Sequence, residues 1–276
     1  EVTRIQLSSV PYALIAENVP DGSITTNKIA DGSITMEKLA DNLKNEKKTN
    51  IGLANSATGA FSFIGGGDAN IASGSYSAVV GGFTNKAQAN YAIAAGGSTN
   101  TANALYATVS GGSSNIASAA NATVSGGGSN SASGSNSVVG GGNTNAATAT
   151  YTTVSGGNAN TANTTQATVG GGYNNKAQAS AATVSGGNSN TASGGNSTVG
   201  GGTSNLASQS NSTVSGGNDN TASGQFSTVG GGGANTASGT SSTVSGGNTN
   251  LANNTYASVG GGYNNQATAQ YATVGG

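Results

Sequence analysis

Residues 190 to 249 read NTASGGNSTVGGGTS, NLASQSNSTVSGGND, NTASGQFSTVGGGGA and NTASGTSSTVSGGNT, and these four lines align without a gap. Each line is fifteen residues long and carries Asn, Ala, Val and a Gly pair at fixed places. The Val register extends in steps of fifteen residues to Val274 and back through Val79 to Ile64. A constant step without insertions is typical of a solenoid, in which each repeat is one coil that contacts its neighbours at identical positions.

Composition restricts the classes of function. Without the periodicity, 48 Gly and long stretches of Ser, Thr and Asn would predict disorder. The chain has no Cys and no His, which removes thiolate and imidazole metal sites and the usual nucleophile pairs. We therefore expect no enzyme, no cofactor and no metal site. Of the 17 charged residues only Asp68, Lys86, Lys176 and Asp219 follow Lys48, so a nucleic-acid partner is not expected. No apolar run is long enough for membrane insertion.

The chain divides into four segments by composition. They are a leader (1–20), decapeptide repeats that begin with DGSIT (21–42), a charged connector (43–51) and the fifteen-residue repeats (52–276). Units as small as DGSITTNKIA bury little surface, so we expect the decapeptides to trimerise with Ile24, Ile29, Ile34 and Leu39 near a shared axis. The N-terminal segment should be irregular or partly helical. The repeat is cut at its C-terminal end, which suggests a longer parent chain.

The coil from Asn211 to Gln225 shows the physics of one repeat. Alternation along a strand turns Ser212 and Val214 inward and Thr213 outward. The following Gly pair permits a tight corner, and a second short extended stretch follows. We expect Val and Asn to form inward structural ladders, with the Asn amides bonded to the backbone and to the neighbouring Asn. Representative ladder residues are Val184, Val199, Val214, Asn190, Asn205 and Asn220.

The pattern N-x-A-S-G-x-x-S-T-V-x-G-G, as in Asn190 to Gly202 and Asn220 to Gly232, resembles the head repeats of trimeric autotransporter adhesins. The resemblance implies a left-handed parallel β-roll and a trimeric fibre. The repeats of that family are one residue shorter. The leader stretch from Gln6 to Leu14, followed by the DGSIT units, looks like segments of phage tail fibres and secreted bacterial surface fibres. Both resemblances imply an extracellular location, on a bacterial cell surface or a phage virion.

Two surface columns are candidates for function. An aromatic residue recurs three places before the Val and could contact a glycan or protein receptor, or pack coil on coil or chain on chain. This aromatic column comprises Phe61, Tyr76, Tyr91, Tyr106, Tyr151, Phe226, Tyr256 and Tyr271. The second column is Thr, often followed two residues later by Ser, and is similar to the face of ice-binding β-solenoids. Thr also suits a strand for purely structural reasons.

Together these features predict an all-β, left-handed parallel β-roll or solenoid of fifteen-residue coils, assembled as a homotrimer. The predicted function is a non-catalytic extracellular fibre or adhesin shaft, which serves as a spacer and contacts a receptor. The alternative is an ice-binding solenoid that uses the Thr-x-Ser face.

Overall fold

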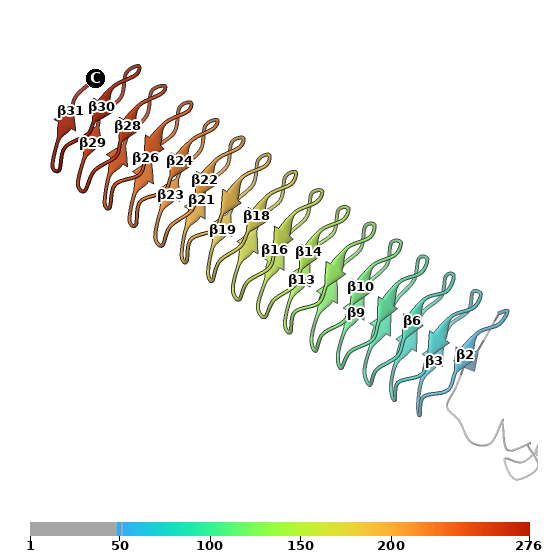
Figure 1. Cartoon of the computed structure of the whole chain (residues 1–276). Helices are drawn as coiled ribbons and strands as arrows, with labels where there is room; N and C mark the ends of the chain where they lie inside the picture. Colours follow the sequence, from blue (N-terminus) through green and yellow to red (C-terminus); the bar gives the residue numbers. More distant parts are fainter. Residues whose placement is uncertain (1–48, 51) are drawn as a thin grey trace, which may run out of the picture. The chain divides into compact units, whose positions relative to one another are not determined.

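The computed structural model of the chain describes residues 49–50 and 52–276, which form a straight stack of coils (Figure 1). The described part is all-β and contains no helix. Each coil contributes one two-residue strand to each of two parallel sheets. Every strand except the two at the ends of each sheet pairs with the equivalent strand one coil earlier and one coil later, as in the register of Val199 against Val184 and Val214. The parallel β-solenoid predicted from the repeat is therefore confirmed.

The odd-numbered strands form a sheet of 16 strands, whose second residue is the Val of the repeat in most coils. They are β1 (Thr49–Asn50), β3 (Phe63–Ile64), β5 (Ala78–Val79), β7 (Ile93–Ala94), β9 (Thr108–Val109), β11 (Thr123–Val124), β13 (Val138–Val139), β15 (Thr153–Val154), β17 (Thr168–Val169), β19 (Thr183–Val184), β21 (Thr198–Val199), β23 (Thr213–Val214), β25 (Thr228–Val229), β27 (Thr243–Val244), β29 (Ser258–Val259) and β31 (Thr273–Val274).

The even-numbered strands form a sheet of 15 strands, each ending in the Ala of the repeat. They are β2 (Ser56–Ala57), β4 (Ile71–Ala72), β6 (Lys86–Ala87), β8 (Thr101–Ala102), β10 (Ile116–Ala117), β12 (Ser131–Ala132), β14 (Ala146–Ala147), β16 (Thr161–Ala162), β18 (Lys176–Ala177), β20 (Thr191–Ala192), β22 (Leu206–Ala207), β24 (Thr221–Ala222), β26 (Thr236–Ala237), β28 (Leu251–Ala252) and β30 (Gln266–Ala267).

Besides the two sheets, a third line of parallel contacts runs along the stack and joins each coil to the next. The residue after the Gly pair forms a single bridge to its equivalent in each neighbouring coil, for example Tyr173 to Asn158 and Asn188. We call this line the bridge column. It comprises Leu53, Asp68, Phe83, Ser98, Ser113, Gly128, Asn143, Asn158, Tyr173, Asn188, Thr203, Asn218, Gly233, Asn248 and Tyr263. The repeat alone predicts two extended stretches per coil, so this column is a feature that the pattern did not reveal.

The core is a narrow strip between the two sheets. The Val of the odd-numbered strands and the Ala of the even-numbered strands are fully buried in nearly every coil, as Val214 and Ala222 illustrate. Ser212 is also buried, whereas Thr213 lies half-exposed on the outer face. Because the side chains that meet across the strip are so small, much of the stability of the stack must come from backbone hydrogen bonds between coils and from polar ladders.

The corners require unusual backbone conformations. Two residues per coil that are not glycine have φ near +55°, one in the aromatic column and one directly after the bridge column, as in Phe226 and Asp219. At Gly217, φ is +89° and an added Cβ would collide with the carbonyl oxygen of Gly232 in the next coil. Only glycine fits that place. The sequence predicts the glycine corner but not the left-handed conformation of the aromatic column.

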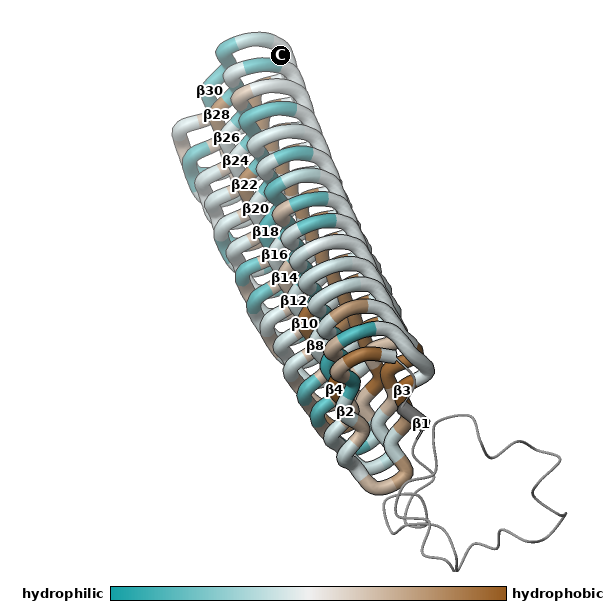
Figure 2. The backbone as a smooth tube through the Cα atoms, turned by 90° about the vertical axis from the view of Figure 1, so that its right-hand side faces the viewer, coloured by the Kyte–Doolittle hydropathy of each residue, from teal (hydrophilic) through white to brown (hydrophobic). Residues whose placement is uncertain are grey.

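Large apolar side chains are unevenly exposed along the stack. Of the 18 that are exposed, 11 lie between Leu53 and Ile116, in the first coils after the N-terminal segment. Figure 2 shows the corresponding hydrophobic stretches around β3. Beyond Val138, all the exposed large apolar residues are Tyr or Phe. The surface of the first coils is therefore more apolar than that of the rest of the stack.

Candidate functional site: the surface columns of the rod

The Asn ladder belongs to the scaffold. The Nδ2 of Asn220 donates to the carbonyl of Gly216 (3.0 Å) and to that of Gly232 in the next coil (2.9 Å). Its Oδ1 accepts the backbone N–H of Asn235 at 3.0 Å. Asn190 and Asn205 make the same three kinds of contact. Each side-chain amide thus satisfies buried backbone groups at the Gly corner and links its own coil to the next, as a structural ladder requires.

The aromatic column lies on the surface of the single chain. All eight of its Phe and Tyr side chains are exposed. The rings of Phe61, Tyr76, Tyr91 and Tyr106 form one continuous stack, with centroids 5.0 to 5.2 Å apart and interplanar angles of 3° to 17°. Tyr256 and Tyr271 form a second stack, with centroids 5.2 Å apart. This spacing matches the distance between strands of neighbouring coils.

Stacking changes what this column can bind. The rings of Tyr76 and Tyr91 each have a neighbouring ring on both faces, so only their edges and hydroxyl groups meet the solvent. A sugar that packs on an aromatic ring needs an open ring face. The stacks therefore favour a coil-on-coil packing role for these rings. Tyr151 and Phe226 belong to the same column but form no ring contact within the described residues.

The Thr column lies on the outer face of the odd-numbered sheet. Seven consecutive coils carry Thr there, in register and half-exposed, from Thr153 in β15 to Thr243 in β27. The next outward residue alternates between Ser and Gly, as in Ser185 and Gly200. The result is one complete row of hydroxyls beside a second row that is filled only in alternate coils.

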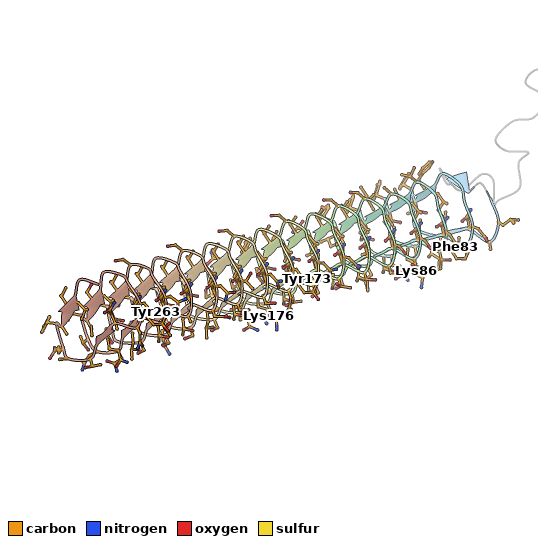
Figure 3. The ribbon with its side chains drawn as sticks, turned by 90° about the horizontal axis from the view of Figure 1, so that it is seen from above. Phe83, Lys86, Tyr173, Lys176 and Tyr263 are labelled. Carbon is orange, nitrogen blue, oxygen red and sulfur yellow. The ribbon has the colours of Figure 1, made fainter. Side chains whose placement is uncertain are left out.

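The bridge column contains a group of residues that the sequence reasoning missed. Its aromatic residues are Phe83, Tyr173 and Tyr263, and a Lys or Gln follows each of them three residues later. The signal was a recurrence at 90 residues, or six coils, which is visible as GGFTNKAQ, GGYNNKAQ and GGYNNQAT. Figure 3 shows the labelled side chains along one edge of the rod.

Within the described residues, no group of three His, Cys, Asp or Glu residues could hold a metal ion. Nor do these residues contain a helix that could cross a membrane. No protein-family model matches the chain, and no curated protein matches it.

Proposed function

We propose that the chain is a non-catalytic extracellular fibre, in which the rod is a spacer and an adhesin shaft on a bacterial cell surface or a phage virion. The observation that carries this proposal is the unbroken register of the coils from β2 to β30, with side chains that are mostly small and uncharged on every face. Such a stack has a length set by the number of coils, about 70 Å for fifteen of them at about 4.8 Å each. A defined length and a surface of small, uncharged side chains are what a spacer needs.

Association into a homotrimer is part of the proposal. The outer face of the odd-numbered sheet is apolar in the first coils, where Phe63, Val80 and Ile93 are exposed, whereas most later coils carry Thr, Ser or Gly at these places. The Phe63 ring lies beside Gly65, where an added Cβ would lie 3.3 Å from it. An exposed apolar patch of this kind favours contact with another copy of the chain. Ile24, Ile29, Ile34 and Leu39, which were predicted to line the trimer axis, lie outside the described residues.

The assembly is tested by native mass spectrometry of the full chain. We expect a trimer at micromolar concentration. Replacing Phe63 and Ile93 by Thr, and Val80 by Ser, should shift the population toward monomer, because the outward residues then match those of the later coils. Val138→Thr is the matched control, since Val138 is exposed in the same column outside the first coils. A parent chain that stays a folded monomer would reject the trimer.

Receptor contact by the aromatic column is tested separately. Replacing Tyr76, Tyr91 and Tyr106 together by Ser should lower the melting temperature, because each stacked pair contributes about 0.5 to 1.5 kcal/mol. If the column also contacts a receptor, the triple variant should lose binding to cells at temperatures where its circular dichroism is unchanged. Full retention of binding would assign the column to packing alone.

Ice binding is a second candidate, favoured by the Thr row from Thr153 to Thr243. Rows of hydroxyls on a flat parallel sheet recur at the strand spacing of about 4.8 Å. If this face orders water, replacing Thr183, Thr198 and Thr213 by Lys should remove thermal hysteresis and inhibition of ice recrystallisation. A parent protein without thermal hysteresis at millimolar concentration would eliminate this candidate.

A further inference from the structure

The aromatic residues of the bridge column are not required by the fold. Other coils carry Ser, Gly, Asn or Thr at the same place and make the same backbone bridge. Even so, Phe83, Tyr173 and Tyr263 recur at intervals of six coils, and Lys86 and Lys176 accompany the first two. At about 4.8 Å per coil, these places are about 29 Å apart along the rod.

The central place illustrates the arrangement. Tyr173 is exposed on the bridge column, and Lys176 lies half-exposed in β18 between Thr161 and Thr191 of the neighbouring strands. Gln178 is exposed two residues further along, since the buried Ala177 separates it from Lys176. An aromatic ring, an ammonium group and a side-chain amide are therefore presented outward from six consecutive residues.

The backbone under this group is held firmly. Between Tyr173 and Lys176 the chain turns Asn175 inward, where its Nδ2 donates to the carbonyls of Gly171 and Gly187 at 2.8 Å each. The backbone N–H of Asn175 donates to Oδ1 of Asn160 at 2.9 Å. Tyr173 and Lys176 are thus attached to a fixed corner, so that a ligand need not order the backbone to bind them.

The side chains themselves are available for a ligand. Tyr173 is exposed, and no other aromatic ring stacks on it within the described residues, in contrast to the stacked rings of Tyr76 and Tyr91. No hydrogen bond or ion pair of the Tyr173 hydroxyl, the Lys176 ammonium or the Gln178 side-chain amide is formed within the same residues. An exposed aromatic ring suits the apolar face of a sugar ring, and an unpaired ammonium suits a carboxylate.

We propose that this edge of the rod binds a linear acidic polysaccharide, with sugar rings on Phe83, Tyr173 and Tyr263 and uronate carboxylates paired with Lys86 and Lys176. The inference rests on the proposed adhesin function and names the chemical class of its ligand. Charge decides against a nucleic acid, whose binding depends on neutralising many phosphates, because the two lysines are about 29 Å apart. A uronate polymer also offers sugar rings and hydroxyls, whose contacts need no lysine. The Asn, Ser and Thr residues between the aromatic places can hydrogen-bond to sugar hydroxyls.

The three places differ in charge. Tyr173 lies between Asn158 and Asn188, whereas Phe83 follows Asp68 in the bridge column. The carboxylate of Asp68 opposes an acidic ligand there. At Tyr263 the Lys is replaced by Gln266. The group around Tyr173 should contribute most of the affinity for the polysaccharide, and the groups around Phe83 and Tyr263 should add to it when one polymer spans all three.

The test uses polygalacturonate and its carboxyl-reduced form as probes, with affinity electrophoresis of the full chain. The aromatic variant replaces Phe83, Tyr173 and Tyr263 by Asn, which other coils carry in this column. The charge variant replaces Lys86 and Lys176 by Thr, which several coils carry at that place. The matched control replaces Tyr76, Tyr91 and Tyr106 by Asn, which also occurs naturally in their column.

We expect the parent to bind polygalacturonate more tightly than the reduced polymer, and added salt should remove the difference. The charge variant should bind polygalacturonate about three- to tenfold more weakly, with no change toward the reduced polymer. The aromatic variant should lose about tenfold or more toward both polymers, and the control variant should bind as the parent does. If polygalacturonate slows the parent and the aromatic variant equally in the gel, the inference is wrong.

Native mass spectrometry and electron microscopy of the same samples separate the two proposals. A trimeric rod that binds neither polymer would contradict the polysaccharide site and leave the fibre intact. A monomeric or unfolded parent would instead contradict the proposed function.

Discussion

At the residue scale, one side chain explains most of the regularity of the coil. Asn is the only polar residue buried in every complete coil from Asn70 to Asn250, and it completes the hydrogen bonding of the Gly corner that follows the Val strand. A short amide side chain is suited to this place because it offers two donors and an acceptor over a small distance. Asp would keep the acceptor, lose both donors and bring an unpaired charge into a dry core.

Asn220→Ala tests the ladder. The substitution leaves the Gly216 carbonyl and the Asn235 N–H without their partner, so the free energy of unfolding should fall by about 2 to 4 kcal/mol. Chemical denaturation followed by circular dichroism measures the loss. Asn103→Ala is the control, since the exposed Asn103 forms no side-chain hydrogen bond within the described residues and should be neutral. Equal midpoints for the two variants would show that the ladder does not stabilise the coil.

Ala181→Asn tests the left-handed corner. Ala181 occupies the aromatic column with φ of +54°, a conformation that costs an ordinary residue about 1 kcal/mol and that Asn tolerates. Asn already stands at the equivalent places Asn196 and Asn211. The variant should gain about 0.5 kcal/mol of stability, seen as a higher melting temperature. A decrease would mean that the side chain, and not the backbone, decides the preference at this place.

At the element scale, each strand has only two residues and is stable only because equivalent strands lie on either side of it. The Gly pair makes this stacking possible, but its two members have different roles. At Gly217 an added Cβ would collide with the Gly232 carbonyl oxygen, while at Gly216 an added Cβ would meet nothing within 4 Å. The pattern GG in the sequence does not distinguish these two places.

Gly217→Ala and Gly216→Ala form a matched pair of adjacent substitutions. The first should lower the free energy of unfolding by about 3 kcal/mol or more, because the next coil must move away and because φ of +89° is strained for Ala. The second should change the melting temperature little. Hydrogen exchange of the amides around β23 and β25 would locate the effect. Similar costs for both would contradict the geometry of the corner.

At the scale of the whole molecule, stability and length are properties of the stack. Each coil contacts mainly its two neighbours, so that complete coils can be removed without disturbing the contacts of the others. The register also explains why the columns stay aligned over the full length of the rod. A single slipped residue would move an inward ladder to the surface.

Deleting residues 190–249, which form four complete coils, should preserve the fold. The shortened chain joins Ser189 to Asn250 and keeps every column in place, so the rod should become about 19 Å shorter. Small-angle X-ray scattering measures the change. Deleting 190–248 instead leaves Thr249 at the place of a ladder Asn and should reduce cooperativity and melting temperature. Equal stability of the two deletions would show that the register is not enforced.

The sequence by itself determined the solenoid, its fifteen-residue coil and the inward direction of Val214 and Asn220, because a fixed period and the alternation of a strand leave few other arrangements. The tertiary structure alone decided which surface residues act together. It placed Tyr76 and Tyr91 face to face in a stack, which covers their ring faces, and it left Tyr173 exposed without a stacked ring. The period gives positions within one coil, whereas contacts between side chains of different coils depend on the corner conformations and on the spacing between strands. Those are properties of the folded stack and not of any one repeat.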